Sequence, residues 1–317
     1  MLSLEYPAMS NFIDLQINGC WGIDFNAAEL TESDWDLASK RLEDSGTSEF
    51  LPTIITDSIE SMVTKIRRLA DYCERRCDGH AIATGIHVEG PFISPITGYI
   101  GAHPKAHAIP ASLNAAKRIL EAGRGWVRML TLAPEMDSNA AVVQFLANQG
   151  VLVAAGHTNA SLDQMQQAID AGLCCFTHLG NGCPAELPRH DNIIHRVMKL
   201  RDRLSVTLIA DGHHLPPWLL QMLIEWFGED RSIIVSDAIS AAGLPSGYHT
   251  LGKRRVWVGD DGVPRSEDRS HFVGSGALLD QMLPLLRDEQ RWPSSSLTKM
   301  FRENARLLLE VANKKNA

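Results

Sequence analysis

Short runs of apolar residues alternate along the chain with longer stretches in which apolar positions recur at helical spacing, about eight times in all. The apolar runs are continuous, as is typical of parallel strands buried on both faces. We predict strands at Phe12–Ile17, Glu49–Ile55, Ala81–Val88, Val127–Leu132, Val151–Ala154, Cys174–Thr177, Ser205–Ala210 and Ser232–Val235. Between them we predict helices at Leu30–Asp44, Ser58–Arg76, Ser112–Ala122, Ser138–Gln149, Ser161–Ala171, His190–Lys199 and Pro216–Phe227, several opened by a capping Ser.

Eight strands with interleaved helices favour a (β/α)8 barrel of the TIM type over an open doubly wound sheet. The first strand is not followed by the Gly-x-Gly-x-x-Gly pattern that a dinucleotide fold needs. After the eighth strand we predict a hairpin, with Arg254–Val258 paired to Arg269–Val273 through a turn at Asp260–Gly262. A closing helix at 277–287 and a C-terminal helix at 297–313 complete one catalytic domain over 1–317.

The composition of the chain argues against nucleic acid and membrane as partners. The chain has 30 Lys and Arg against 38 Asp and Glu, a formal charge of −8, and no basic block, so nucleic acid is not an expected partner. No apolar run approaches the roughly 18 residues of a membrane span, and the first residues do not read as an export signal. Six cysteines in a chain of this size are expected to be reduced thiols, which indicates a cytoplasmic protein.

Polar residues follow four of the predicted strands: His87 and Glu89, then His157, His178 and Asp237. In a barrel these strand ends meet at one mouth. A lone histidine at a strand end is usually a structural residue, but structural residues have no reason to collect at one end of a barrel. A carboxylate with two imidazoles suits one divalent transition ion per subunit, with Zn²⁺ as our choice and Fe²⁺ or Co²⁺ as alternatives.

The motifs around these residues resemble those of the N-acetylglucosamine-6-phosphate deacetylases, a family of the amidohydrolase superfamily of metal-dependent barrels. The most specific is His-Val-Glu-Gly-Pro-Phe-Ile-Ser-Pro at 87–95. The series also includes Asp-Leu-Gln-Ile-Asn-Gly at 14–19, Gly-Ala-His-Pro at 101–104, Gly-His-Thr-Asn-Ala at 156–160, Thr-His-Leu at 177–179, Ala-Asp-Gly-His-His at 210–214 and Ser-Asp-Ala at 236–238. They occur in the family's order over nearly the whole chain.

The resemblance implies roles for individual residues. Glu89, His157 and His178 would hold the ion, which activates a water and polarises the acetyl carbonyl, and Asp237 would be the catalytic acid and base. Related hydrolases carry His-x-His on the first strand for a second ion; the residues here are Gln16 and Asn18, so we expect one metal site. The resemblance also implies substrate contacts from His103, Asn181 and His214, with His214 supplied across a dimer interface.

Two departures from the family pattern bear on the substrate and the architecture. The loop after the sixth strand is altered over 180–192, where Gly180 and Gly182 replace bulkier residues and Arg189 becomes the candidate phosphate ligand. The family's small flanking β-sandwich is expected to be absent. Apolar surface uncovered in this way would favour a homodimer.

We therefore predict hydrolysis of the N-acetyl amide of an amino sugar, N-acetylglucosamine 6-phosphate, to glucosamine 6-phosphate and acetate. One alternative is a related amidohydrolase acting on a different N-acyl or cyclic amide substrate. A second is a metal-free barrel glycosidase in which Glu89 and Asp237 act as the carboxylate pair. A third is a barrel that has lost catalysis and only binds.

Overall fold

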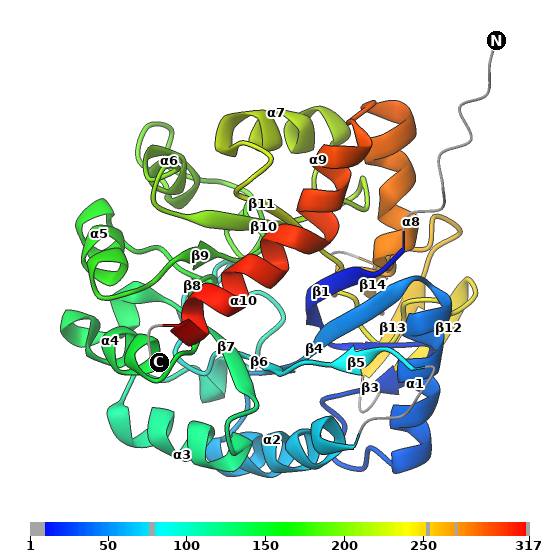
Figure 1. Ribbon diagram of the computed structural model, residues 1–317, viewed down its shortest axis with the longest axis horizontal. Helices are drawn as coiled ribbons and strands as arrows, with labels where there is room; N and C mark the ends of the chain where they lie inside the picture. The colour runs from blue at the N-terminus through cyan, green and yellow to red at the C-terminus, as the bar shows by residue number, and fades with distance from the viewer. Residues whose placement is uncertain (1–9, 76–79, 252–253, 270–271, 315–317) are drawn as a thin grey trace.

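The computed structural model describes residues 10–75, 80–251, 254–269 and 272–314. Eight parallel strands follow one another in the order β1-β4-β6-β7-β8-β9-β10-β11 (Figure 1). Their bounds are Phe12–Ile17, Thr47–Ile55, Ile86–Glu89, Val127–Leu132, Leu152–Ala155, Cys175–Phe176, Ser205–Ile209 and Ser232–Val235. The prediction of a (β/α)8 barrel is confirmed.

The first and last strands of the barrel meet at its mouth. Ile17 forms an isolated parallel bridge with Ala238, just beyond β11. The backbone N–H of Asp237 donates to the carbonyl of Gln16 at 2.9 Å, and that of Asn18 donates to the carbonyl of Ala238 at 2.7 Å. The hydrogen bonds that close the barrel are therefore made by residues of the predicted site and their neighbours.

Helices surround the strands (Figure 1). They are α1 Glu32–Asp44, α2 Ile59–Glu74, α3 Leu113–Gly123, α4 Ala141–Asn148, α5 Leu162–Asp170, α6 Ile193–Lys199, α7 Pro217–Phe227 and α8 Leu279–Pro284. Side-chain caps begin five of them, at Thr31, Ser58, Ser112, Ser161 and Asn192. Each cap accepts a hydrogen bond from a first-turn N–H that has no partner within its helix.

The last helical segments cover the end of the barrel opposite the site. They are α9 Ser294–Thr298, a π-helical turn at Lys299–Glu303, and α10 Asn304–Lys314. The ring of Phe301 packs on that of Phe12, the first residue of β1, with 5.5 Å between centroids. In the described ranges, none of the helices combines the length and the apolar character that crossing a bilayer demands.

The barrel strands are largely buried, with polar residues among the apolar ones. All six residues of β1 are buried, including Asp14 and Gln16. Burial of such groups is costly unless they find partners. Asp14 finds its partners within the barrel, where its Oδ1 accepts from the N–H groups of Gln16 and Ser236, both at 3.2 Å.

The predicted hairpin is wrong in its second strand. The segment forms a three-stranded antiparallel sheet of β12 Gly247–Leu251, β13 Arg254–Val258 and β14 Pro264–Ser266. The turn is tighter than predicted, because Gly262 has a φ of 75° and the Asp261 carboxylate accepts from the N–H of Val263 at 3.1 Å. The return strand thus starts at Pro264, and Phe272 makes only an isolated bridge.

Other boundaries also differ from prediction. The expected strand Ala81–Val88 is two strands, β5 Ile82–Ala83 and β6, and a small unpredicted ladder joins β2 Gly19–Cys20 to β3 Ile23–Asp24. Gly85 separates β5 from β6, and a Cβ there would overlap the side chain of Arg128. Helix α6 begins at Ile193, after its Asn192 cap, and the predicted closing helix ends in a π-helical turn at Leu285–Glu289.

We expect the substitution Gly156→Ala to destabilise the barrel. A Cβ at this position would overlap the Oγ1 of Thr177 and lie 2.8 Å from the Cγ2 of Thr131, so the ends of three neighbouring strands would have to move. Overpacking of this kind costs about 1–3 kcal/mol of unfolding free energy. Denaturant unfolding measures it, with Gln144→Ala on the exposed face of α4 as the control; equal stability of the two variants would contradict the packing argument.

Candidate metal-dependent active site

The predicted site residues lie together at the carboxyl ends of the strands. Glu89 ends β6, whereas His157, His178 and Asp237 each follow their strand by two residues. These three residues have positive φ values of 51°, 33° and 45°. The left-handed region is unfavourable for side chains other than glycine, so the surrounding barrel must hold them there. Such conformations are typical of functional positions.

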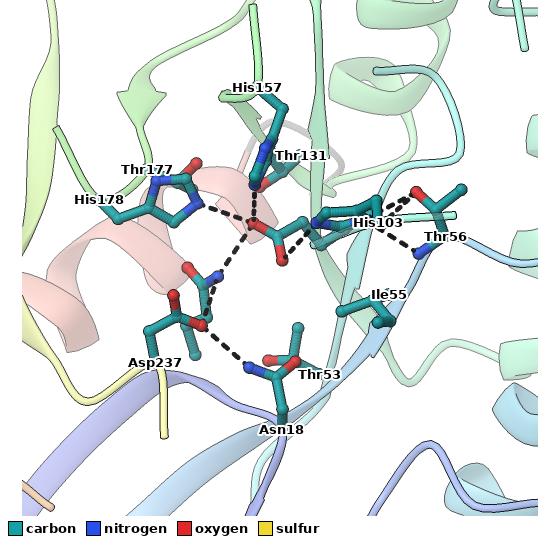
Figure 2. A network of polar contacts seen from close by, with 12 residues as sticks. Asn18, Thr53, Ile55, Thr56, His103, Thr131, His157, Thr177, His178 and Asp237 are labelled. Carbon is teal, nitrogen blue, oxygen red and sulfur yellow. Dashed lines mark hydrogen bonds and ion pairs between the residues drawn. The ribbon is translucent and has the colours of Figure 1, made fainter. Parts of the chain in front are cut away.

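Glu89, His157 and His178 form a compact buried cluster. One ligand atom from each lies within 4.8 Å of the other two. The Nε2 atoms of His178 and His157 lie 2.9 Å and 3.3 Å from Glu89 Oε1. Figure 2 shows both imidazoles pointing toward the same centre from separate segments of the chain. The structure thus brings together the three residues that the sequence predicted as metal ligands.

The donor set fits a divalent transition ion. The Nδ1 of His157 lies 2.8 Å from the carbonyl oxygen of Tyr99, which places a proton on Nδ1 and directs Nε2 at Glu89, where an ion would replace the Nε2 proton. The backbone N–H of His178 donates to Thr207 Oγ1 at 2.7 Å and so fixes the start of its loop. Two such nitrogens and one carboxylate leave room for further ligands in a tetrahedral shell.

The charge on Glu89 is stabilised although the residue is fully buried. Burial acts to raise its pKa, but hydrogen bonds from His103, His157 and His178 lower the pKa well below its ordinary value. The Nε2 of His103 lies 3.5 Å from Glu89 Oε2, and Thr56 Oγ1 holds the His103 Nδ1 at 2.9 Å. The carboxylate is therefore ionised and available as a ligand.

Gln16 and Asn18 connect the ligand cluster to Asp237. The Nε2 of Gln16 donates to Glu89 Oε1 at 3.0 Å and to Asp237 Oδ1 at 3.1 Å. The Nδ2 of Asn18 donates to the same Asp237 oxygen at 2.9 Å (Figure 2). Amide N–H groups thus occupy the space between the two carboxylates. As oriented here, both amides present N–H groups to these carboxylates, which is the arrangement expected around one ion.

The electrostatic surroundings of Asp237 suit an acid–base group. Burial is the largest influence and, with the charge of Glu89, raises the pKa of Asp237 to about 6, although His178 and His214 act to lower it. A carboxyl group whose pKa lies near neutrality can accept a proton and return it at physiological pH.

A cavity of about 560 Å³ opens over the cluster. Its walls include the predicted substrate contacts His103, Asn181 and His214. His214 was expected from across a dimer interface, but the chain places it in its own cavity, with Nδ1 2.7 Å from Asp211 Oδ2. Arg189 is exposed and does not belong to the described lining.

Several residues of the site have roles that sequence reasoning missed. Thr56 and Asp211 orient His103 and His214, and Asp57 and Lys65 line the cavity beyond the second barrel strand. Asp57 follows β4 as directly as the predicted residues follow theirs, and this position was the available signal. His87 has a structural place, with Nε2 2.8 Å from Thr131 Oγ1 and a pKa that burial lowers to about 4.

Comparisons with known proteins find similar chains among the N-acetylglucosamine-6-phosphate deacetylases. The N-acetylglucosamine-6-phosphate deacetylase of Lysinibacillus sphaericus is 29% identical over 306 residues, 96% of this chain and 77% of the relative. The human enzyme of that name is 35% identical over 284 residues, 86% of this chain and 66% of the relative. A solved structure of the Mycobacterium smegmatis enzyme, a variant in complex with N-acetyl-D-glucosamine-6-phosphate, superimposes with a TM-score of 0.84 at 29% identity, covering 95% of this chain and 77% of that one. No family model matches the chain.

Loss of either imidazole ligand should abolish tight metal binding. We expect His157→Ala to lower the bound divalent metal by roughly tenfold or more, because two ligands cannot hold the ion against dialysis. Metal analysis of purified protein measures this, with His190→Ala in the exposed loop as the control. Full metal content in the His157 variant would contradict the assignment.

The bridging amide of Gln16 provides a separate test. In Gln16→Glu a third carboxylate would face Glu89 and Asp237, so the metal-free variant should lose about 3–5 kcal/mol of stability. Divalent cations should restore it more strongly than they stabilise the original protein. Thermal unfolding with chelator and with added Zn²⁺ measures both effects, and Gln167→Glu on the exposed side of α5 is the control. A metal-free Gln16→Glu protein as stable as its parent would refute the bridging role.

Proposed function

Because the chain belongs to the N-acetylglucosamine-6-phosphate deacetylase family of the amidohydrolase superfamily, we propose that it cleaves the acetyl–nitrogen bond of N-acetylglucosamine 6-phosphate to give glucosamine 6-phosphate and acetate. The observation that carries the proposal is the convergence of Glu89, His157 and His178 beside Asp237, in one cavity at the barrel mouth.

The residues of the cluster define what the cofactor would do. Glu89 and the Nε2 atoms of His157 and His178 would hold a divalent ion, for which we propose Zn²⁺, with Fe²⁺ or Co²⁺ as alternatives. When bound, such an ion supplies Lewis acidity toward the amide carbonyl and lowers the pKa of water.

Asp237 moves the protons of the reaction. Its Oδ1 is held by Gln16 and Asn18, which fixes the carboxyl group at the edge of the ligand cluster. Asp237 accepts a proton from the attacking water and later delivers it to the departing nitrogen. Without that proton an amine is a poor leaving group, so both transfers are needed.

His103, Asn181 and His214 are the proposed contacts to the substrate. His103 stands next to Glu89, where the acetyl group must lie, and His214 is fixed by Asp211 on another wall of the cavity. Arg189 stays a prediction as a phosphate ligand, since its exposed side chain lies outside the described lining.

The altered loop at 180–192 favours one alternative, a related amidohydrolase acting on a different N-acyl or cyclic amide substrate. One relative, 28% identical over 242 residues, is an N-acetylgalactosamine-6-phosphate deacetylase of Escherichia coli. Assays with N-acetylglucosamine, its 6-phosphate and N-acetylgalactosamine 6-phosphate separate these substrates. The metal-free glycosidase fits poorly, because its ionised nucleophile would be Glu89, whose Oε1 is already contacted by His157, His178 and Gln16 and whose Oε2 faces His103.

We also propose that the protein is a homodimer and that it is located in the cytoplasm. Trp218, Met222 and Trp226 are exposed at helical spacing along α7, and burying such side chains between two copies would stabilise a dimer.

The decisive test of the mechanism is Asp237→Asn. The amide keeps the size of the side chain but cannot take up a proton, so we expect turnover to fall by about 10²–10⁴-fold while the metal content stays near that of the original protein. Acetate release from N-acetylglucosamine 6-phosphate measures turnover, and Asp163→Asn on the exposed face of α5 is the control. Near-normal turnover by Asp237→Asn would remove this residue from the mechanism.

A further inference from the structure

The cavity continues past the ligand cluster to a second polar region, formed by Asp57, Ser61 and Lys65. Asp57 follows β4, and the other two residues project from the first turns of α2. The Lys65 side chain is only 13% exposed although it carries a charge. A lysine held this far from solvent at a cavity wall has lost much of its hydration and favours a polar partner in the cavity.

Asp57 fixes the ammonium group of Lys65 in place. Lys65 Nζ lies 2.8 Å from Asp57 Oδ2, which also accepts from Ser61 Oγ at 2.6 Å, while Asp57 Oδ1 accepts from the N–H of Ser58 at 2.7 Å. An ammonium group has three donors. In the described part of the chain Asp57 is the one acceptor found for Lys65, so two donors remain for a ligand.

This region lies across the barrel mouth from the other polar wall of the cavity. β4 is the second strand in the barrel order, whereas His178 and His214 follow the sixth and seventh strands, β9 and β10. We consider a substrate with its amide at the ligand cluster. If one edge of its sugar ring faces His214, the opposite edge faces Lys65.

We propose that Lys65, positioned by Asp57, is a specificity-determining residue that binds a hydroxyl group of the amino sugar on this side of the cavity. The inference rests on the proposed function and adds a subsite to it. A neutral group is the expected ligand here, because the Asp57 carboxylate already balances the charge of Lys65. A sugar hydroxyl can accept from the ammonium group and donate to the Asp57 carboxylate, whereas an anion would be repelled by that carboxylate.

The competing explanation is a structural ion pair that only ties the start of α2 to the end of β4. The two readings differ in what Lys65→Met changes, since methionine keeps the length and the apolar packing of the stem but removes the donors. A structural pair predicts a lower melting temperature with unchanged KM. A hydroxyl subsite predicts a KM about tenfold higher with kcat changed by less than about threefold.

The experiment compares Lys65→Met and Lys65→Arg with the original enzyme, using N-acetylglucosamine 6-phosphate and analogues that each lack one hydroxyl group. Lys40→Met, which removes an exposed ion pair with Asp44 on α1, is the matched control and should leave KM unchanged. For one analogue, we expect kcat/KM with the original enzyme to be about tenfold lower than for N-acetylglucosamine 6-phosphate. With Lys65→Met the same analogue should be nearly as good as the full substrate, because the hydroxyl that it lacks is the one that Lys65 would bind. Lys65→Arg should recover part of the loss.

A KM for Lys65→Met within twofold of the original, or unchanged discrimination against every analogue, would overturn the subsite. Calorimetric binding of N-acetylglucosamine 6-phosphate in the Asp237→Asn background separates this failure from failure of the proposed function. Binding that weakens with Lys65→Met while the unmodified enzyme shows no turnover would reject the deacetylase activity but keep the subsite. Absence of binding would reject both.

Discussion

The buried negative charge of Glu89 constrains the rest of the site. An isolated carboxylate in the interior would cost several kcal/mol, so its partners must be in place whenever the protein is folded. Here His178, His157 and His103 approach it at 2.9, 3.3 and 3.5 Å, and Gln16 donates to it at 3.0 Å. These partners come from five separate segments of the chain, Glu89 included. Only a closed barrel brings so many strand ends to one point.

Closure of the barrel and assembly of the site depend on the same residues. The backbone hydrogen bonds that join β1 to the segment after β11 are made by Gln16, Asn18, Asp237 and Ala238. The side chains of Gln16 and Asn18 also donate to the carboxylate of Asp237. A register shift at this seam would therefore misplace Asp237. The left-handed backbone at Asp237 is maintained by the same bonds, which links the strain at this residue to the integrity of the fold.

The sequence predicts the barrel and the ligand cluster well, because both depend on local pattern. Continuous apolar runs mark the strands, and Glu89 or Asp237 stands out where such a run ends. The return strand at Pro264 and the break at Gly85 were missed because they depend on a turn conformation and on contact with Arg128. The His214 placement and the Lys65 region could not be read from sequence, since a helix presents its residues to a cavity only through packing against distant strands.

The amides of Gln16 and Asn18 hold the carboxylate of Asp237 by hydrogen bonds, without a cation beside it. Where a second ion would neutralise two neighbouring carboxylates, Gln16 Nε2 donates to Glu89 and Asp237 together. Because both amides belong to the segment of strand β1, the chain itself holds the Asp237 carboxylate in this position. Burial is the largest influence on Asp237 and, with the charge of Glu89 that a neutral amide does not offset, raises its pKa to about 6 before any ion binds. An ion held by Glu89, His157 and His178 would lower this pKa, so Asp237 would be ionised at neutral pH and able to take up a proton from water. The two amides on the first strand therefore hold the Asp237 carboxylate in place without adding a positive charge beside it, which suits the proposed site for one ion.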